Sequence, residues 1–234
     1  MKISVVVPTY NESHGIREFL AQFEKQTLPR QEFEIVIVDG GSPDGTAKLA
    51  ANGSDRVIRQ ESRGIGGARN DGVAAARSGL IATTDADCRV PDDWLENIVE
   101  DFEDPEVVAV CGPDGPLDGG LKARAIFLFL RALIRIAAAA GVYGTGGTNS
   151  GFRKAAFQAI GGYRSLPHSD DIDLGARIRS LGRIRYDPRL FVHLSVRRLE
   201  KQGYMRTLLL WLRGDLKVLS GRPFEASEYA RQEY

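Results

Sequence analysis

The fold of this chain is decided by the stretch LIATTDADC, residues 80–88. It begins as a short apolar run of strand length, which is typical of a buried strand in a parallel sheet, and it ends in two carboxylates, Asp85 and Asp87. Because burying two unpaired charges is costly, we expect both to emerge at the carboxyl end of the strand, where open α/β sheets bind ligands. There they could hold a divalent cation and, through it, nucleotide phosphates. Asp-x-Asp is also common in solvated turns, so its meaning depends on the rest of the chain.

The composition predicts one sizeable core and gives no sign of a nucleic-acid partner. The chain has 234 residues, and 31 lysines and arginines balance 31 aspartates and glutamates, so any electrostatic function must be local. Cys88 and Cys111 are too few for a disulfide framework and lack metal spacing, which fits a reducing cytoplasm. The apolar run at residues 3–7 is too short for a signal peptide and is expected to be the first strand.

Strand and helix patterns alternate over the first ninety or so residues. Strands are expected at 3–7, 34–39, 56–59 and 80–84, and helices at about 13–26, after Gly45 and at 71–77. This order predicts parallel βαβ units with right-handed crossovers. The glycine-rich lead at 63–70 matches neither the dinucleotide fingerprint nor the P-loop.

Parallel strands end at one edge of a sheet, so polar residues after three of these strands should converge there. They are residues 9–12, Asp39, and the pair Asp85 and Asp87. Acids after strands also cap helices. We interpret Asp44 as such a cap, and for Asp39 the cap and the ligand contact both remain open.

Four motifs, in this order and at these distances, resemble one family: PTYNE (8–12), VDGGSPDGT (38–46), GARN (67–70) and DAD (85–87). They resemble the nucleotide-sugar half of family 2 glycosyltransferases, which have the GT-A fold. The resemblance runs from about residue 2 to about residue 195. It implies an α/β protein with a mostly parallel central sheet flanked by helices. We therefore predict a single GT-A catalytic domain over residues 1–220, followed by a polar tail at 221–234.

The resemblance also implies a donor site. The residues that it places around the nucleotide sugar are Pro8, Thr9, Glu12, Asp39, Arg69, Asp85, Ala86 and Asp170. Asp87, with help from Asp85, would hold Mn²⁺ or Mg²⁺. His193 is a candidate third ligand or diphosphate contact, and a partly buried, hydrogen-bonded histidine is the equal alternative.

The stretch SDDIDLGAR, residues 169–177, is the candidate for catalysis. Its acids suit the first turn of a helix, and capping accounts for at least one of them. The stretch also resembles the family's Glu-Asp motif, with Asp170 in place of the glutamate, and by that match Asp171 is the general base. An acceptor hydroxyl needs such a base because it is a poor nucleophile until its proton can leave.

Two predicted helices, 121–140 and 201–220, carry basic stripes among apolar residues. The stripes consist of Arg124, Arg131 and Arg135, and of Arg206, Arg213 and Lys217. The arginines interrupt any run long enough to cross a bilayer. Three interpretations remain open: ordinary packed helices with a solvated basic face, contact with a membrane surface, and packing against a partner or a second copy.

The remaining segments are interpreted as scaffold: a helix at 92–101, a strand at 107–111, a glycine-rich loop from 144 leading to a strand and a helix at 155–160, and a closing strand pair at 183–186 and 190–193. Arg197 and Arg198 could reach the diphosphate. The chain lacks the Gln-x-x-Arg-Trp motif of the family's processive polymerases.

Together these features predict an inverting, metal-assisted glycosyltransferase that moves a single sugar to an acceptor hydroxyl. The acceptor would be a glycan or a lipid-linked molecule at the cytoplasmic membrane face. A nucleotidyltransferase is the first alternative, although no basic triphosphate-binding motif lies near the first strand. A sugar-nucleotide-binding protein without catalysis is the second.

Overall fold

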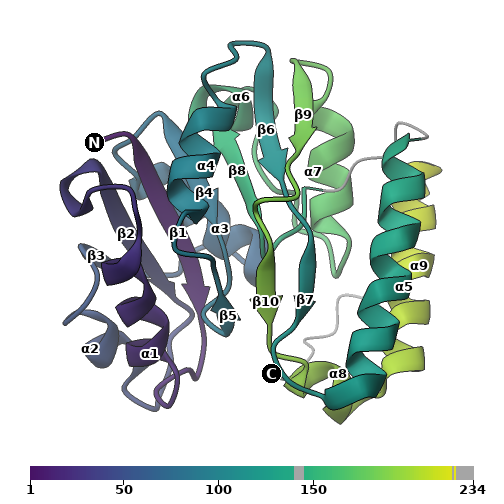
Figure 1. The fold of residues 1–234 in the computed structure, drawn as a ribbon, viewed down its shortest axis with the longest axis horizontal. Helices are drawn as coiled ribbons and strands as arrows, with labels where there is room; N and C mark the ends of the chain where they lie inside the picture. Colours follow the sequence, from purple (N-terminus) through teal and green to yellow (C-terminus); the bar gives the residue numbers. More distant parts are fainter. Residues whose placement is uncertain (140–144, 223, 225–234) are drawn as a thin grey trace.

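A seven-stranded sheet forms the centre of the computed structural model, which describes residues 1–139, 145–222 and 224 (Figure 1). The strand order is β3-β2-β1-β4-β8-β6-β9. The bounds are β1 (Ile3–Thr9), β2 (Phe33–Asp39), β3 (Arg56–Arg59), β4 (Leu80–Thr83), β6 (Val107–Cys111), β8 (Ser150–Arg153) and β9 (Arg183–Tyr186). Strand β8 runs antiparallel to β4 and β6, and the other neighbours are parallel. The predicted mostly parallel sheet is confirmed.

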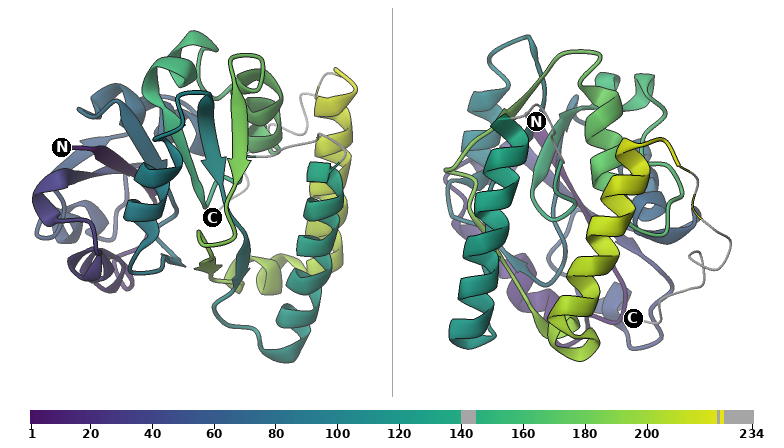
Figure 2. Two further views of the ribbon diagram at one scale, coloured as in Figure 1. Left: turned by 45° about the horizontal axis from the view of Figure 1, so that its top comes forward. Right: turned by 90° about the vertical axis from the view of Figure 1, so that its right-hand side faces the viewer.

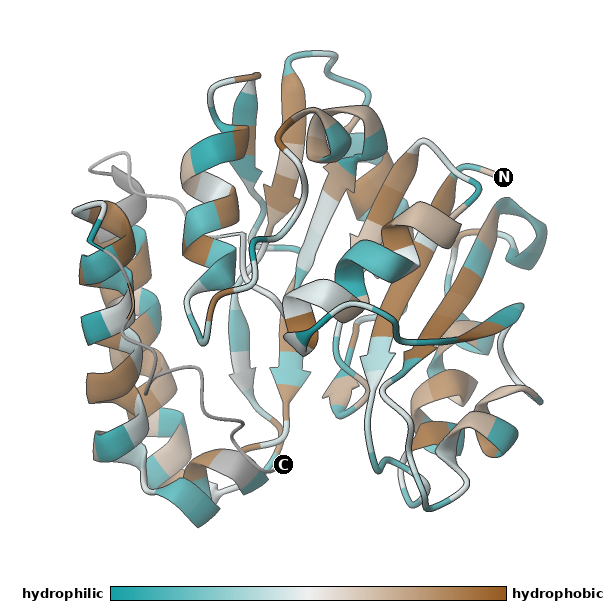
Figure 3. Cartoon of the chain, turned by 180° about the vertical axis from the view of Figure 1, so that it is seen from behind, coloured by the Kyte–Doolittle hydropathy of each residue, from teal (hydrophilic) through white to brown (hydrophobic). Residues whose placement is uncertain are grey.

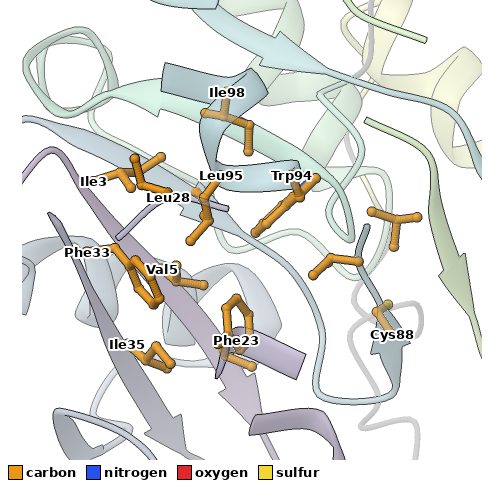
Figure 4. Packing of buried hydrophobic residues seen from close by; sticks show 14 of the residues in the cluster. Ile3, Val5, Phe23, Leu28, Phe33, Ile35, Cys88, Trp94, Leu95 and Ile98 are labelled. Atoms are coloured by element: carbon orange, nitrogen blue, oxygen red, sulfur yellow. The ribbon is translucent and has the colours of Figure 1, made fainter. Parts of the chain in front are cut away.

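Helices cover both faces of this sheet, because its central strands are apolar on both sides. Val5 and Val7 face one core, which includes side chains of α1 (Ile16–Ala21), α2 (Thr46–Ala50) and α4 (Trp94–Asp101) (Figure 4). Val6 faces the other core, with α3 (Gly64–Ala75), α6 (Lys154–Ala159) and α7 (Asp170–Ile178). Two short 3₁₀ helices, η1 (Gln22–Lys25) and η2 (Arg30–Glu32), complete the connection from α1 to β2.

Helix α3 begins seven residues earlier than predicted. The expected glycine-rich lead forms about the first two turns of the helix itself, which starts at Gly64 instead of Asp71. Its glycines allow α3 to lie close to the sheet. A Cβ on Gly72 would come within 2.3 Å of a methyl carbon of Val6, so close packing outweighs the low helix propensity of glycine here.

A second, three-stranded sheet follows the order β5-β10-β7, and we call it the small sheet. Its strands are β5 (Cys88–Arg89), β10 (Val192–Leu194) and β7 (Asp114–Pro116). The predicted closing strand pair is therefore wrong. Strand β9 pairs with β6 in the central sheet, whereas β10 pairs with β5 and β7.

Three helices stand at one side of the molecule, and we call them the flank (Figure 2). They are α5 (Gly120–Ala139), α8 (Arg197–Gln202) and α9 (Tyr204–Leu219). A small cluster joins them, formed by Ala123, Phe127, Val196, Leu199 and Tyr204. In the described part of the chain, no helix is long and apolar enough to cross a membrane.

Some predicted positions lie outside the described residues. They are residue 140 of the predicted helix 121–140, the start of the glycine-rich loop at residue 144, and most of the tail, 223 and 225–234.

Candidate active site

The loops after β1 and β2 are tied to each other by hydrogen bonds from main chain to side chain. The Asn11 amide donates to Ser42 Oγ at 3.0 Å, and the Glu12 amide donates to Thr46 Oγ1 at 2.9 Å. The Ser13 amide donates to Asp44 Oδ2 at 3.0 Å. Burial alone would raise the pKa of Asp44, but its hydrogen bonds from Thr46 and Ser13 outweigh this effect and lower it. Asp44 thus ties the two loops together and accepts from the amide of Thr46, the first residue of α2, at 3.1 Å, although the N-cap residue of that helix is Gly45.

The carboxylate of Asp39 is also used by its own loop. Oδ2 accepts from the amides of Gly41 at 3.0 Å and Ser42 at 2.9 Å, and Oδ1 accepts from Ser42 Oγ at 2.6 Å. Asp39 lies beside Thr9 in the parallel register of β1 and β2, and Pro8 lies beside Val38. Asp39 therefore holds the loop that follows β2, whereas the N-cap residue of α2 is Gly45. The contact of Asp39 with a base remains a prediction.

Arg69 brings together two acids that lie 85 residues apart in sequence. Its Nη2 donates to Asp85 Oδ1 at 2.8 Å, and its Nη1 lies 3.9 Å from Asp170 Oδ2. The arginine side chain is only 3% exposed, and its guanidinium lies 5.6 Å from the centre of the Tyr163 ring. A buried cation needs such partners because an unpaired charge is costly to desolvate.

This arrangement changes the pKa values of the groups involved. Burial raises the pKa of Asp170 to about 6; Arg69 opposes the rise and the neighbouring Asp171 adds to it. For Arg69, burial alone would lower the pKa, but Asp85, Tyr163 and Asp170 outweigh it and raise the value. Arg69 is a permanent cation, and Asp170 titrates closer to neutral pH than an ordinary aspartate.

Asp87 lies on the other side of Ala86, which is buried. Its Oδ2 is 4.0 Å from Arg197 Nη2, and the same nitrogen is 3.4 Å from Glu12 Oε2. Arg197, the first residue of α8, thus links the loops after β1 and β4. The prediction that it reaches the donor side remains open, and the side chain of Arg198 lies outside the described residues.

Asp171 lies in the first turn of α7, directly after Asp170. Its Oδ1 accepts from the Ile172 amide at 2.9 Å, and its main-chain oxygen accepts from Thr145 Oγ1 at 3.1 Å. Helix α7 therefore places Asp171 next to the acid that shares Arg69 with Asp85. In the structure, one acid of the loop after β4, Asp85, and one acid of α7, Asp170, thus meet at Arg69.

A divalent cation fits the donor set of Asp85 and Asp87. Mg²⁺ sites in nucleotide enzymes often use one or two carboxylates and complete the shell with water and substrate phosphates. In the described part of the chain, no group of three or more His, Cys, Asp or Glu side chains could hold a metal ion by itself. The third-ligand role of His193 stays a prediction. His193 lies on β10 opposite Arg89, with its ring 4.9 Å from the Phe191 ring.

Sequence reasoning missed two acids near the candidate base, Asp114 and Asp215, both of which interact electrostatically with Asp171. Asp114, on β7, interacts electrostatically with both Arg131 and Asp171, and burial is the main reason why its pKa rises to about 6. The three-residue strand that carries Asp114 has no readable periodicity, so no sequence signal marked it.

The fold and the site together define an α/β protein with the GT-A fold, with acidic loops at the carboxyl ends of its parallel strands. Residues 4–161 match the sequence profile of glycosyl transferase family 2. The chain therefore belongs to glycosyl transferase family 2, and the predicted resemblance is confirmed.

Named relatives match about half of this chain. Glycosyltransferase AglE of Haloferax volcanii is 34% identical over 116 residues, which are 47% of this chain and 38% of AglE. The dolichol-phosphate mannosyltransferase of Pyrococcus furiosus is 29% identical over 115 residues, which are 47% of this chain and 32% of that protein. The matched regions thus span well under half of these relatives' lengths.

Solved structures share the fold over most of this chain. The mannosyltransferase PcManGT of Pyrobaculum calidifontis, solved with GDP-Man and Mn²⁺, has a TM-score of 0.78 at 24% identity and covers 97% of this chain and 66% of its own. Residues 1–349 of S. aureus TarS, solved with UDP-GlcNAc, have a TM-score of 0.66 at 22% identity. This match covers 83% of the present chain and 58% of the TarS chain. The predicted GT-A fold is confirmed.

Proposed function

We propose that this chain is an inverting glycosyltransferase that moves one sugar from a nucleotide-diphospho-sugar to an acceptor hydroxyl. The observation that carries the proposal is the position of Arg69 between Asp85 and Asp170. It joins the acidic loop of the donor side to the helix that holds the candidate base. The ligands of PcManGT and TarS, GDP-Man and UDP-GlcNAc, support a donor of this class.

In this proposal, Asp171 removes the proton from the acceptor hydroxyl as the hydroxyl attacks the anomeric carbon in line with the leaving diphosphate. Asp87, assisted by Asp85, would hold Mn²⁺ or Mg²⁺, which when bound stabilises charge on the departing diphosphate. Pro8, Thr9, Glu12 and the loop held by Asp39 would line the nucleotide.

The test is an incubation with a panel of nucleotide sugars and Mn²⁺, with and without a chelator, followed by an assay of free nucleoside diphosphate. Two substitutions separate the roles. Asp87→Ala should abolish metal-dependent nucleotide binding, whereas Asp171→Asn should keep binding and lose turnover. Release of pyrophosphate from a nucleoside triphosphate would instead indicate a nucleotidyltransferase, and binding without turnover would indicate a non-catalytic protein.

We also propose that the acceptor is lipid-linked and that the flank contacts the cytoplasmic face of a membrane. Helices α5 and α9 expose large apolar side chains, among them Leu121, Phe129, Ile136, Met205, Leu212 and Leu216. Figure 3 shows these apolar segments alternating with polar ones along both helices. Exposed apolar patches bordered by cations are typical of surfaces that bind anionic membranes. The two cysteines are free and buried, in agreement with a reducing compartment.

Sedimentation with anionic liposomes tests this placement. The chain should bind at low salt and less at high salt, because screening weakens the attraction between arginines and lipid headgroups. The double variant Leu212→Glu and Leu216→Glu should not bind. The matched control is Leu181→Glu, an exposed leucine in the turn after α7. Dimerisation of the wild type, abolished by the same double variant without any liposome binding, would instead support contact with a second copy.

A further inference from the structure

A pocket of about 540 Å³ lies between α5 and the small sheet, and its polar wall is cationic. Arg124 and Arg131 enter it from α5, Arg89 from β5 and His193 from β10. The basic stripe predicted on α5 therefore contributes two of its arginines to this pocket. Its third member, Arg135, does not line the pocket.

Among the residues that the structure describes, the Nε of Arg131 has no hydrogen-bond acceptor. The guanidinium lies 5.1 Å from the centre of the Phe191 ring, and this Nε is buried. A buried N–H without an acceptor costs folding free energy. A bound anion would accept a hydrogen bond from this N–H and remove that cost.

Few acids compete for this pocket. Asp114 does not line the pocket but interacts electrostatically with Arg131; burial raises the pKa of Asp114 to about 6, so at pH 7 it is largely ionised and offsets part of the charge of Arg131. Arg89 has an ion partner in Glu18 at 3.5 Å, and both side chains are well exposed, so that pair is weak. Burial, then Arg89 and Arg131, lower the pKa of His193. His193 can donate a hydrogen bond from one ring nitrogen in either protonation state.

The rest of the wall is apolar, with Pro116, Leu117, Leu128 and Phe191. The pocket is also close to the candidate base, because Asp114 interacts with both Arg131 and Asp171. The pocket is also connected to the loop after β4. Ser195, two residues after His193, donates its amide to the main-chain oxygen of Asp87 at 3.2 Å.

We propose that this pocket binds a phosphate group of the acceptor, with Arg131 and Arg124 on the phosphate oxygens and the attached organic chain along Leu128 and Phe191. Arginine pairs with phosphate through two parallel hydrogen bonds, which suits a fixed guanidinium in a partly dehydrated pocket. The identification of the ligand as the acceptor rests on the proposed function. The binding of a phosphate group to this pocket requires neither the sugar donor nor a metal ion.

The test is isothermal titration of the full chain without nucleotide sugar or divalent cation. The probes are geranyl phosphate below its micelle concentration, geraniol, glucose 1-phosphate and inorganic phosphate. We expect geranyl phosphate to bind and geraniol not to bind. Loss of one charge-assisted contact should weaken geranyl phosphate at least tenfold in Arg131→Gln and in Arg124→Gln. Arg135→Gln, one helical turn further along α5 and outside the pocket, should stay within twofold.

The outcomes separate the sources of the phosphate. Preference for geranyl phosphate over both water-soluble phosphates indicates a lipid-borne group, and equal binding of all three indicates a free or sugar phosphate at the same site. No binding of any phosphate, or equal weakening by the pocket variants and Arg135→Gln, overturns the proposal. Because Arg124 is exposed, its variant remains informative if Arg131→Gln does not fold. Failure here leaves the donor assay unaffected, so the two proposals fail separately.

Discussion

Arg69 and Arg131 lie in two regions of the molecule that differ in the partners they provide for a guanidinium group. Arg69, beneath the donor loops, is 3% exposed and lies between the carboxylates of Asp85 and Asp170. Arg131, in the flank, rests on an aromatic ring and keeps a buried N–H without an acceptor in the described part of the chain. Arg69 therefore stabilises the structure of the site, whereas Arg131 is the arginine that we propose for ligand binding.

Asp171 lies between these two regions, and its substitution should give the largest effect. We expect Asp171→Asn to lower kcat by about 10²- to 10⁴-fold, because general-base catalysis contributes on this scale. Donor affinity and melting temperature should change little, since neither arginine region loses a contact. Turnover assays and donor titrations on the same preparation measure both. Asp92→Asn, an exposed aspartate before α4, is the control, and undiminished turnover in Asp171→Asn would refute the base assignment.

Replacing each arginine by methionine tests the contrast directly. Arg69→Met leaves Asp85 and Asp170 without their cation, and breaking a buried ion pair in this way costs about 3–5 kcal/mol of unfolding free energy. Arg131→Met leaves this ion pair intact and should cost less than about 1 kcal/mol. Urea denaturation of both variants gives the comparison. Equal losses would show that the two arginines are structurally equivalent.

Gly214, on α9 of the flank, packs against the residues that precede α7, the helix of the candidate base, and a larger side chain there should push the two helices apart. A Cβ at this position would lie 2.0 Å from His168 Nδ1 and 2.5 Å from Ser169 Oγ, directly before Asp170. We expect Gly214→Ala to cost about 1–3 kcal/mol, as overpacking does, and to lower kcat more than it changes donor affinity. The neighbouring exposed variant Arg213→Ala should stay within about 0.5 kcal/mol. A Gly214→Ala protein with normal kcat would mean that α9 does not position Asp171.

The smallest effect concerns pH. The pKa of Asp170 is raised by burial to about 6, above its value in the unfolded chain, so the folded state binds the extra proton between about pH 4 and pH 6. Asp170 therefore makes the unfolding free energy fall as the pH rises through this window. In Asp170→Asn, this fall should be reduced, as measured by denaturation at several pH values.

Asp44 should affect the pH dependence of the unfolding free energy in the opposite direction, and the same denaturation experiment measures it. Its pKa is lowered in the folded state, so it contributes stability above the unfolded value near 3.9 that is lost as the pH falls. Asp44→Asn should reduce the acid-side loss and leave the window between pH 4 and pH 6 unchanged. The same response in both variants would contradict these assignments.

The sequence predicted the donor half well because its elements are long and apolar. Strands β1, β2 and β4 are buried runs that end in polar loops, and both the runs and the common edge were readable from the sequence. The start of α3 was misjudged because its glycines serve close packing against β1, a tertiary effect that propensity does not contain.

The other wrong or missed predictions also concern features that depend on contacts between distant parts of the chain. Strands β5, β7 and β10 have two or three residues each, too few for a period, so their pairing into the small sheet could not be read. Likewise, the basic stripe of α5 was visible, but only the position of the small sheet shows that Arg124 and Arg131 turn toward a pocket. The contact of Arg197 with Glu12 spans 185 positions and left no local signal.

A crystal structure with Mn²⁺ and a non-hydrolysable nucleotide-diphospho-sugar would test the central claim most directly. We expect the metal on Asp87 and the Asp171 carboxylate on the face of the anomeric carbon opposite the diphosphate. A bound sugar whose anomeric carbon faces away from α7, with Asp171 out of reach of any incoming hydroxyl, would contradict it.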